Sequence, residues 1–193
     1  MAIFKEAYDI TMRNEGGYIN DSTDAGGETY KGISRVYHPS WYGWSMIDNE
    51  KYRSDFPDCL HYDNELQEAV EDFYKEKYWN INRLNDFPQS IANELFDTGV
   101  NMGAGKAAKF LQECLNYLNR NGLLFKDLVV DGVIGEKTLK ALSKVMSDEN
   151  ILLVMLNVCQ GRHYMEYMAK SPTQEKYARG WFSRVKITKK INI

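Results

Sequence analysis

The sequence contains few cysteines, histidines and prolines. Cys59, Cys114 and Cys159 are odd in number and far apart, with no CxxC spacing and no partnering histidine. This pattern argues against a disulfide framework and against a zinc site. We therefore expect reduced thiols, with Cys114 and Cys159 as small core residues in apolar-periodic segments. The three histidines are unclustered, and we expect no metal and no cofactor.

An excess of charge of one sign is also missing, since 24 Lys and Arg oppose 27 Asp and Glu for a net charge of −3. This balance gives no general attraction to nucleic acid or to anionic membranes, so neither is an expected partner. No apolar run approaches the roughly 18 residues of a membrane helix. The N-terminal segment has scattered charges and no apolar stretch before a cleavage site. We expect a soluble protein that is synthesised in the cytoplasm without a recognisable signal peptide.

Helical periodicity is the main pattern of apolar residues in the sequence. Apolar residues recur every three or four positions in about seven segments, which begin near Ile3, Asp63, Gln89, Lys106, the glycine turn before Leu139, Ser147 and Pro172. Asp63 is a candidate N-cap, and Gly103 and Gly105 interrupt the segment that begins at Gln89. The sequence therefore predicts a mainly α fold with one small β element.

The stretch from residue 14 to residue 34, NEGGYINDSTDAGGETYKGIS, breaks this periodicity. Glu15 follows the first predicted helix, which Gly16 and Gly17 terminate. The negative end of a helix dipole disfavours a carboxylate and raises its pKa, so Glu15 can stay protonated near neutral pH. The rest of the stretch alternates β-prone pieces with a strong turn signal at residues 24–27. We predict a small hairpin or β-flap.

This stretch resembles the signature of the glycoside hydrolase family 108 muramidases, lysozyme-like enzymes related to phage endolysins. The family opens with a Glu-Gly-Gly-Tyr motif and a Gly-Gly-x-Thr turn. Later agreement comes from FYKEKYW (73–79), ELFDTGVNMG (94–103), DGVIGEKTLKAL (131–142) and RGWFSRV (179–185). The last two resemble the family's C-terminal part, often described as a peptidoglycan-binding domain. Lys31 departs from the family pattern, which often has an aromatic residue there, and some members have been named secretion activators.

The resemblance implies a lysozyme-like fold with a catalytic lobe at residues 1–88 and a helical lobe at residues 89–193 that resembles a peptidoglycan-binding domain. We expect the two lobes to form one compact unit and the protein to be a monomer. The implied reaction is cleavage of the β-1,4 bond between N-acetylmuramic acid and N-acetylglucosamine in bacterial peptidoglycan, with Glu15 as the catalytic acid. The protein would then act on the cell wall after release or export.

Glycoside hydrolysis needs an acid for the departing oxygen and a group that stabilises or attacks the oxocarbenium-like centre. Glu15 suits the first role. The order Glu15, Asp24, Thr29 resembles phage-type lysozymes, and we infer an inverting reaction in which Asp24 and Thr29 hold the attacking water. Simpler alternatives remain open. In these alternatives Glu15 is only a surface charge, Asp24 only shapes the turn, and Thr29 only forms a hydrogen bond to the flap backbone. Asp21 is a second candidate for the catalytic role given to Asp24.

The aromatic residues Tyr18, Tyr30 and Trp41 are candidate stacking platforms for sugar rings, with Trp44 as a further one. Their alternative role is in the core or in anchoring loops. Asp97 and Asn101 share one helical face and are candidate substrate contacts or, alternatively, buried hydrogen-bonding groups. The segment around residues 131–132 either binds peptidoglycan or is a turn that packs the last helices.

Two other functions compete with a muramidase. One is a non-catalytic peptidoglycan-binding or secretion-accessory protein, against which the retained Glu15, Asp24 and Thr29 count. The other is a lytic transglycosylase, which uses one glutamate and adds no water to its product. The additional Asp and Thr on the flap favour hydrolysis.

Overall fold

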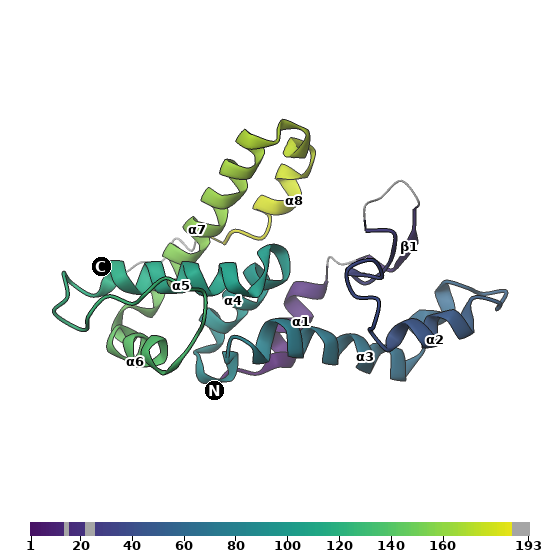
Figure 1. The fold of residues 1–193 in the computed structure, drawn as a ribbon, viewed down its shortest axis with the longest axis horizontal. Helices are drawn as coiled ribbons and strands as arrows, with labels where there is room; N and C mark the ends of the chain where they lie inside the picture. Colours follow the sequence, from purple (N-terminus) through teal and green to yellow (C-terminus); the bar gives the residue numbers. More distant parts are fainter. Residues whose placement is uncertain (14–15, 22–25, 187–193) are drawn as a thin grey trace. The chain divides into compact units, whose positions relative to one another are not determined.

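The computed structural model describes residues 1–13, 16–21 and 26–186 (Figure 1). Glu15 and Asp24 lie outside these ranges. The described residues form eight α-helices and one three-stranded antiparallel sheet. The predicted mainly α fold with a small β element near the N-terminus is therefore confirmed. The chain divides into two compact units, Tyr8–Lys77 and Met1–Ala7 with Tyr78–Ile193.

The Tyr8–Lys77 unit contains the small sheet, built from β1 (Tyr18–Asn20), β2 (Glu28–Tyr30) and β3 (Ile33–Ser34). Strand β2 is central, and its Thr29 pairs with Ile19 on one side and with Ser34 on the other. Only Lys31 and Gly32 separate β2 from β3, and both have positive φ, 44° and 78°. A two-residue hairpin loop of this kind requires positive φ at both positions. The predicted hairpin or β-flap is confirmed in its place, and it has a third strand at the β-prone position Ile33.

This unit also contains the helices α2 (Gly43–Glu50) and α3 (Asn64–Tyr74), a 3₁₀ turn (Asp58–His61) and part of α1. The Asp63 carboxylate caps α3 by accepting a hydrogen bond from the Leu66 amide at 3.0 Å, as predicted. The apolar stripe of α3 is buried, and the Tyr74 hydroxyl donates to the carbonyl of Lys31 at 2.7 Å. This bond holds the β2–β3 loop against α3. Lys31, which departs from the family pattern, therefore has a defined place in the hairpin.

The second unit contains α4 (Gln89–Met102), α5 (Ala104–Leu118), α6 (Glu136–Lys144), α7 (Glu149–Lys170) and α8 (Ala178–Phe182). Gly103, with φ of 93°, separates α4 from α5 at the predicted break. Pro172 begins a 3₁₀ turn (Pro172–Tyr177) rather than an α-helix, and α8 starts after it. The fully buried Trp79 packs edge-on against Phe4 and Phe96, with ring centroids 5.6 and 6.0 Å away.

The helix α1 (Phe4–Met12) crosses the boundary between the two units in the chain. The predicted lobe boundary after residue 88 lies eleven residues beyond the boundary at Lys77. The cysteines are free and buried, as expected for core residues, and the Cys114 and Cys159 sulfurs are 3.8 Å apart. That contact and burial both raise the pKa of the Cys114 thiol. None of the described helices is long and apolar enough to cross a membrane.

Candidate active site

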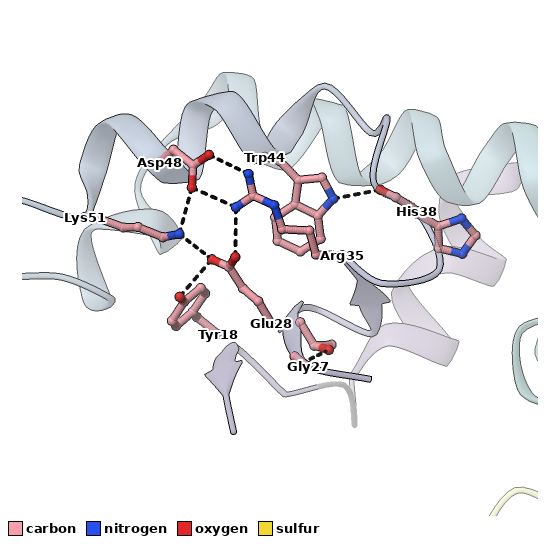
Figure 2. A network of polar contacts seen from close by, with 9 residues as sticks. Tyr18, Gly27, Glu28, Arg35, His38, Trp44, Asp48 and Lys51 are labelled. Carbon is pink, nitrogen blue, oxygen red and sulfur yellow. Dashed lines mark hydrogen bonds and ion pairs between the residues drawn. The ribbon is translucent and has the colours of Figure 1, made fainter. Parts of the chain in front are cut away.

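A network of charged side chains ties the flap to α2 (Figure 2). The Glu28 carboxylate on β2 accepts hydrogen bonds from Tyr18 Oη at 2.9 Å and from Arg35 Nη1 at 2.8 Å, and it pairs with Lys51 Nζ at 2.7 Å. Arg35 also forms a two-bond pair with Asp48 on α2, at 2.8 and 2.6 Å. Lys51 reaches Asp48 as well, at 2.7 Å. The network therefore joins β1, β2, the segment after β3 and α2.

The electrostatics of this network keep Glu28 ionised. Partial burial alone would raise the pKa of Glu28, but the hydrogen bonds from Lys51, Arg35 and Tyr18 together outweigh burial and lower it. The hydrogen bonds from Arg35 and Lys51 likewise lower the pKa of Asp48. A carboxylate with three donors and 12% of its side chain exposed is a poor general acid. Glu28 therefore positions the flap, a role that the sequence did not predict because no periodicity links Glu28 to Arg35, seven positions away, or to the more distant Lys51.

Thr29 is the predicted catalytic residue that the structure describes. It is half-buried in the central strand, and its hydroxyl donates to the carbonyl of Gly27 at 3.2 Å. This is the flap-backbone bond that the simpler alternative proposed. Its hydroxyl oxygen keeps lone pairs that accept hydrogen bonds, so the catalytic role of Thr29 stays a prediction. The predictions for Glu15 and Asp24 concern residues outside the described ranges.

The three candidate stacking residues differ in exposure. Tyr18 is half-buried and contributes its hydroxyl to Glu28. Tyr30 is 2% exposed, and its hydroxyl donates to the carbonyl of Leu60 at 3.1 Å. Trp41 is 7% exposed, and its indole N–H donates to a backbone carbonyl of α3 at 3.3 Å. The burial of Tyr30 and Trp41 favours the core role that was the alternative for them, and sugar stacking by any of the three stays a prediction.

Asp97 and Asn101 lie on α4, in the second unit. Asp97 accepts hydrogen bonds from Arg184 Nη1 at 2.9 Å and from Gln160 Nε2 at 3.0 Å. Its carboxylate therefore connects α4 with α7 and with the segment after α8. Asn101 is exposed, and its amide donates to the carbonyl of Asp97 at 2.8 Å. The structure thus gives Asp97 an internal hydrogen-bonding role and leaves Asn101 open to solvent.

Glu94 on α4 is a second acidic residue that sequence reasoning missed. Only 8% of it is exposed. Burial, with Asp97 nearby as a second cause, raises the pKa of Glu94 to about 7. Near-neutral carboxyl pKa values are frequent in catalytic sites, but a general acid must also reach its substrate. The burial of Glu94 indicates an internal role. A signal was available in the sequence, because Glu94 and Asp97 stand three positions apart among apolar residues.

We expect Glu94→Gln to stabilise the protein above pH 7. The folded-state pKa of about 7 exceeds the roughly 4.3 of an unfolded glutamate. Between these two pKa values the folded state holds a proton on Glu94 that the unfolded state has lost. The contribution of Glu94 to the free energy of unfolding therefore decreases as the pH rises toward 7. The amide cannot ionise, so the variant should gain roughly 1–3 kcal/mol at pH 8 and little at pH 4. Denaturant unfolding at the two pH values measures this, and equal gains at both would contradict it.

Among the described residues, no group of three or more His, Cys, Asp and Glu side chains is arranged to hold a metal ion. The network around Glu28 is built from carboxylates, cations and a phenolic hydroxyl. Such groups suit acid–base work and the binding of polar substrates.

Comparison with known proteins agrees with this chemistry. Residues 8–103 match the family model described as glycosyl hydrolase 108, and residues 106–186 match the model described as predicted peptidoglycan domain. SagA of Brucella abortus has a similar structure, with a TM-score of 0.61 and 26% sequence identity over 94% of this chain and 88% of that chain. Among curated proteins, no sequence matches.

Together the two models define a glycoside hydrolase type of protein with a peptidoglycan-related function. The chain belongs to the glycosyl hydrolase 108 family and carries a predicted peptidoglycan domain after the hydrolase domain. The family resemblance seen in the sequence is confirmed. The two models meet at residues 103–106, which is the α4–α5 break at Gly103.

Proposed function

We propose that this protein is a muramidase that hydrolyses the β-1,4 bond between N-acetylmuramic acid and N-acetylglucosamine in bacterial peptidoglycan, with Glu15 as general acid. One observation carries the proposal. The glycosyl hydrolase 108 match over residues 8–103 contains the Glu-Gly-Gly-Tyr motif at residues 15–18, and the second match is to a peptidoglycan domain. The likeness to SagA over nearly the whole chain supports it.

The position of Glu15 in the chain supports its role as the acid. Helix α1 ends at Met12, three residues before Glu15. The last turn of α1 contains no basic residue, and Arg13 directly follows it. A carboxyl near that end has its neutral form favoured. This is the protonation state that a general acid needs at neutral pH.

In the proposed reaction Glu15 donates its proton to the glycosidic oxygen, which leaves as the 4-hydroxyl of N-acetylglucosamine. Asp24 accepts a proton from water while the water oxygen forms the new bond to the anomeric carbon of N-acetylmuramic acid. Because the water attacks the face opposite the departing oxygen, the configuration inverts. Each proton lost by one carboxyl is balanced by a proton gained by the other.

The hydrogen bonding of Thr29 defines what it contributes to this step. Its hydroxyl hydrogen is directed to Gly27 O at 3.2 Å. The hydroxyl oxygen is therefore an acceptor toward a water molecule, which it orients by taking one of the water hydrogens. The Glu28 network supports this arrangement, since it fixes the strand on which Thr29 lies.

Digestion of purified peptidoglycan tests the proposal. The released fragments are reduced with borohydride, and the sugar alcohol at each new end is identified by mass spectrometry. We expect N-acetylmuramic acid at the reduced ends. Anhydro ends would instead establish a transglycosylase, and N-acetylglucosamine at the reduced ends would establish cleavage of the other glycosidic bond. Sedimentation with the wall without any released fragment would establish the binding-only alternative.

A further inference from the structure

A second candidate binding site lies wholly within the second unit, between α4, α7, the 3₁₀ turn and α8. It is a pocket of about 290 Å³. This volume lies just below the roughly 300–1,000 Å³ typical of small-molecule sites. Its lining combines aromatic rings with neutral polar groups, namely Asn101, Met102, His163, Tyr164, Tyr167, Gln174 and Trp181.

The aromatic side of the pocket is a cluster of rings around Trp181. Tyr164 stacks on Trp181 with centroids 5.2 Å apart and ring planes within 12°. Tyr167 lies 5.9 Å from Trp181 at 58° and is 46% exposed. Rings of this type are apolar on the face and polar at one end, and they are frequent where a ligand must be held in contact with water. The cluster is thus partly accessible rather than wholly part of the core.

The polar side of the pocket carries no formal charge. Asn101 and Gln174 supply amides, which both donate and accept hydrogen bonds. Burial, and then the charge of Lys106, lower the pKa of His163, so its imidazole is neutral at neutral pH. Asp97, a carboxylate near Tyr164, is paired with Arg184 at 2.9 Å, and Glu94 and Glu166 are further carboxylates close to Tyr164 and His163. Such a lining suits a neutral ligand with hydroxyl and amide groups, and it gives no reason to expect an ion or a phosphate.

Tyr164 contributes an aromatic ring to the pocket and keeps its hydroxyl buried. It is 4% exposed, and its hydroxyl has no hydrogen-bond partner among the described residues. Burial raises the pKa of this phenol, so it remains a donor. Buried polar groups without partners are uncommon and destabilising. The hydroxyl oxygen has no accessible surface, so Tyr164 contributes its ring to the pocket, and the amides of Asn101 and Gln174 supply the polar contacts.

We propose that this pocket binds one N-acetylated hexose unit of a glycan strand, with its ring against Tyr167 and Trp181 and its acetamido group at Asn101 and Gln174. The proposal rests on the proposed function for the choice of peptidoglycan glycan as the ligand, but it does not depend on Glu15 as the acid. Aromatic faces match the C–H faces of a sugar ring, and neutral amides match its acetamido group. The pocket then retains the protein on the wall through α7 and α8 of the peptidoglycan domain together with the end of α4.

The test follows backbone hydrogen exchange in peptides covering residues 163–182 of the full-length Glu15→Gln chain while a tetramer of N-acetylglucosamine is added. We expect exchange in these peptides to slow and to saturate. In the Tyr167→Ala background, the concentration at half-saturation should rise at least about tenfold. Trp181→Phe, which keeps a ring, should bind nearly as the parent does. A glucose tetramer, which lacks the acetamido group, should bind more weakly.

Tyr117→Ala is the matched control, because Tyr117 is 71% exposed on the same domain and lines a different hollow. It should leave the exchange response unchanged. No protection of residues 163–182, or protection that is the same in Tyr167→Ala, would overturn the proposed pocket. Hydrolysis by the wild-type chain is measured in parallel. Hydrolysis without protection of residues 163–182 would contradict only the proposed pocket. Protection without hydrolysis would contradict only the proposed muramidase activity.

Discussion

Glu15→Gln should lower the rate of peptidoglycan solubilisation by about 100- to 10,000-fold, the range over which general acid–base groups act. The amide has nearly the shape of the carboxyl but has no proton to give to the departing oxygen. The change adds no volume and leaves the described network of Glu28 untouched. Sedimentation with purified peptidoglycan and the thermal unfolding temperature should therefore stay close to those of the wild type.

Two matched variants separate the role of Glu15 from a general loss of charge. Glu6→Gln removes an exposed carboxylate from the same N-terminal segment, and Glu94→Gln removes the buried carboxyl with the near-neutral pKa. Both should solubilise peptidoglycan at rates close to the wild type. If Glu94→Gln were inactive and Glu15→Gln active, the assignment of the acid would be wrong.

Glu28→Ala should produce the largest loss of stability in the flap. The change removes three hydrogen bonds to one ionised group that is mostly buried and leaves the Tyr18 hydroxyl without this acceptor. Hydrogen bonds to charged groups contribute roughly 1.5–3 kcal/mol, and Arg35 and Lys51 keep Asp48 as a partner. We therefore expect the free energy of unfolding to fall by roughly 2–3 kcal/mol, together with a loss of activity because Thr29 is no longer held.

The pH dependence of this loss has a defined sign. The folded-state pKa of Glu28 is lowered, so its contribution is fully present above the unfolded pKa of about 4.3 and is lost as the pH falls through the folded value. The stability difference between wild type and Glu28→Ala should thus be largest at neutral pH and shrink on acidification. Denaturant unfolding across that range measures it, with Glu68→Gln as the exposed control. A difference that is constant with pH would contradict the ionised network.

The features that the sequence predicted well are those determined by neighbouring residues. The Asp63 cap, the apolar stripe of α3 and the break at Gly103 each depend on a few adjacent positions. The family motif is local in the same sense. The motif identified the family because its glycines and hydroxyl residues stand at fixed spacings, and these spacings do not depend on the rest of the chain.

The features that were missed join distant residues. The partners of Glu28 include Lys51, 23 positions away, which no periodicity reveals. The Tyr30 hydroxyl donates to the carbonyl of Leu60 and accepts from the Gln67 amide, 30 and 37 positions away. Likewise, the pocket at Trp181 combines α4 with residues that lie more than 60 positions further along the chain, which no local pattern reveals.

The most direct test is digestion of peptidoglycan in water enriched in heavy oxygen, by wild type and by Glu15→Gln. Hydrolysis places one heavy oxygen on the anomeric carbon of each new N-acetylmuramic acid end. We predict that wild-type products carry this label, which mass spectrometry detects as an increase in the mass of each product. Glu15→Gln should yield almost no labelled product. Unlabelled anhydro ends from the wild type, or equal labelling by the variant, would contradict the proposal.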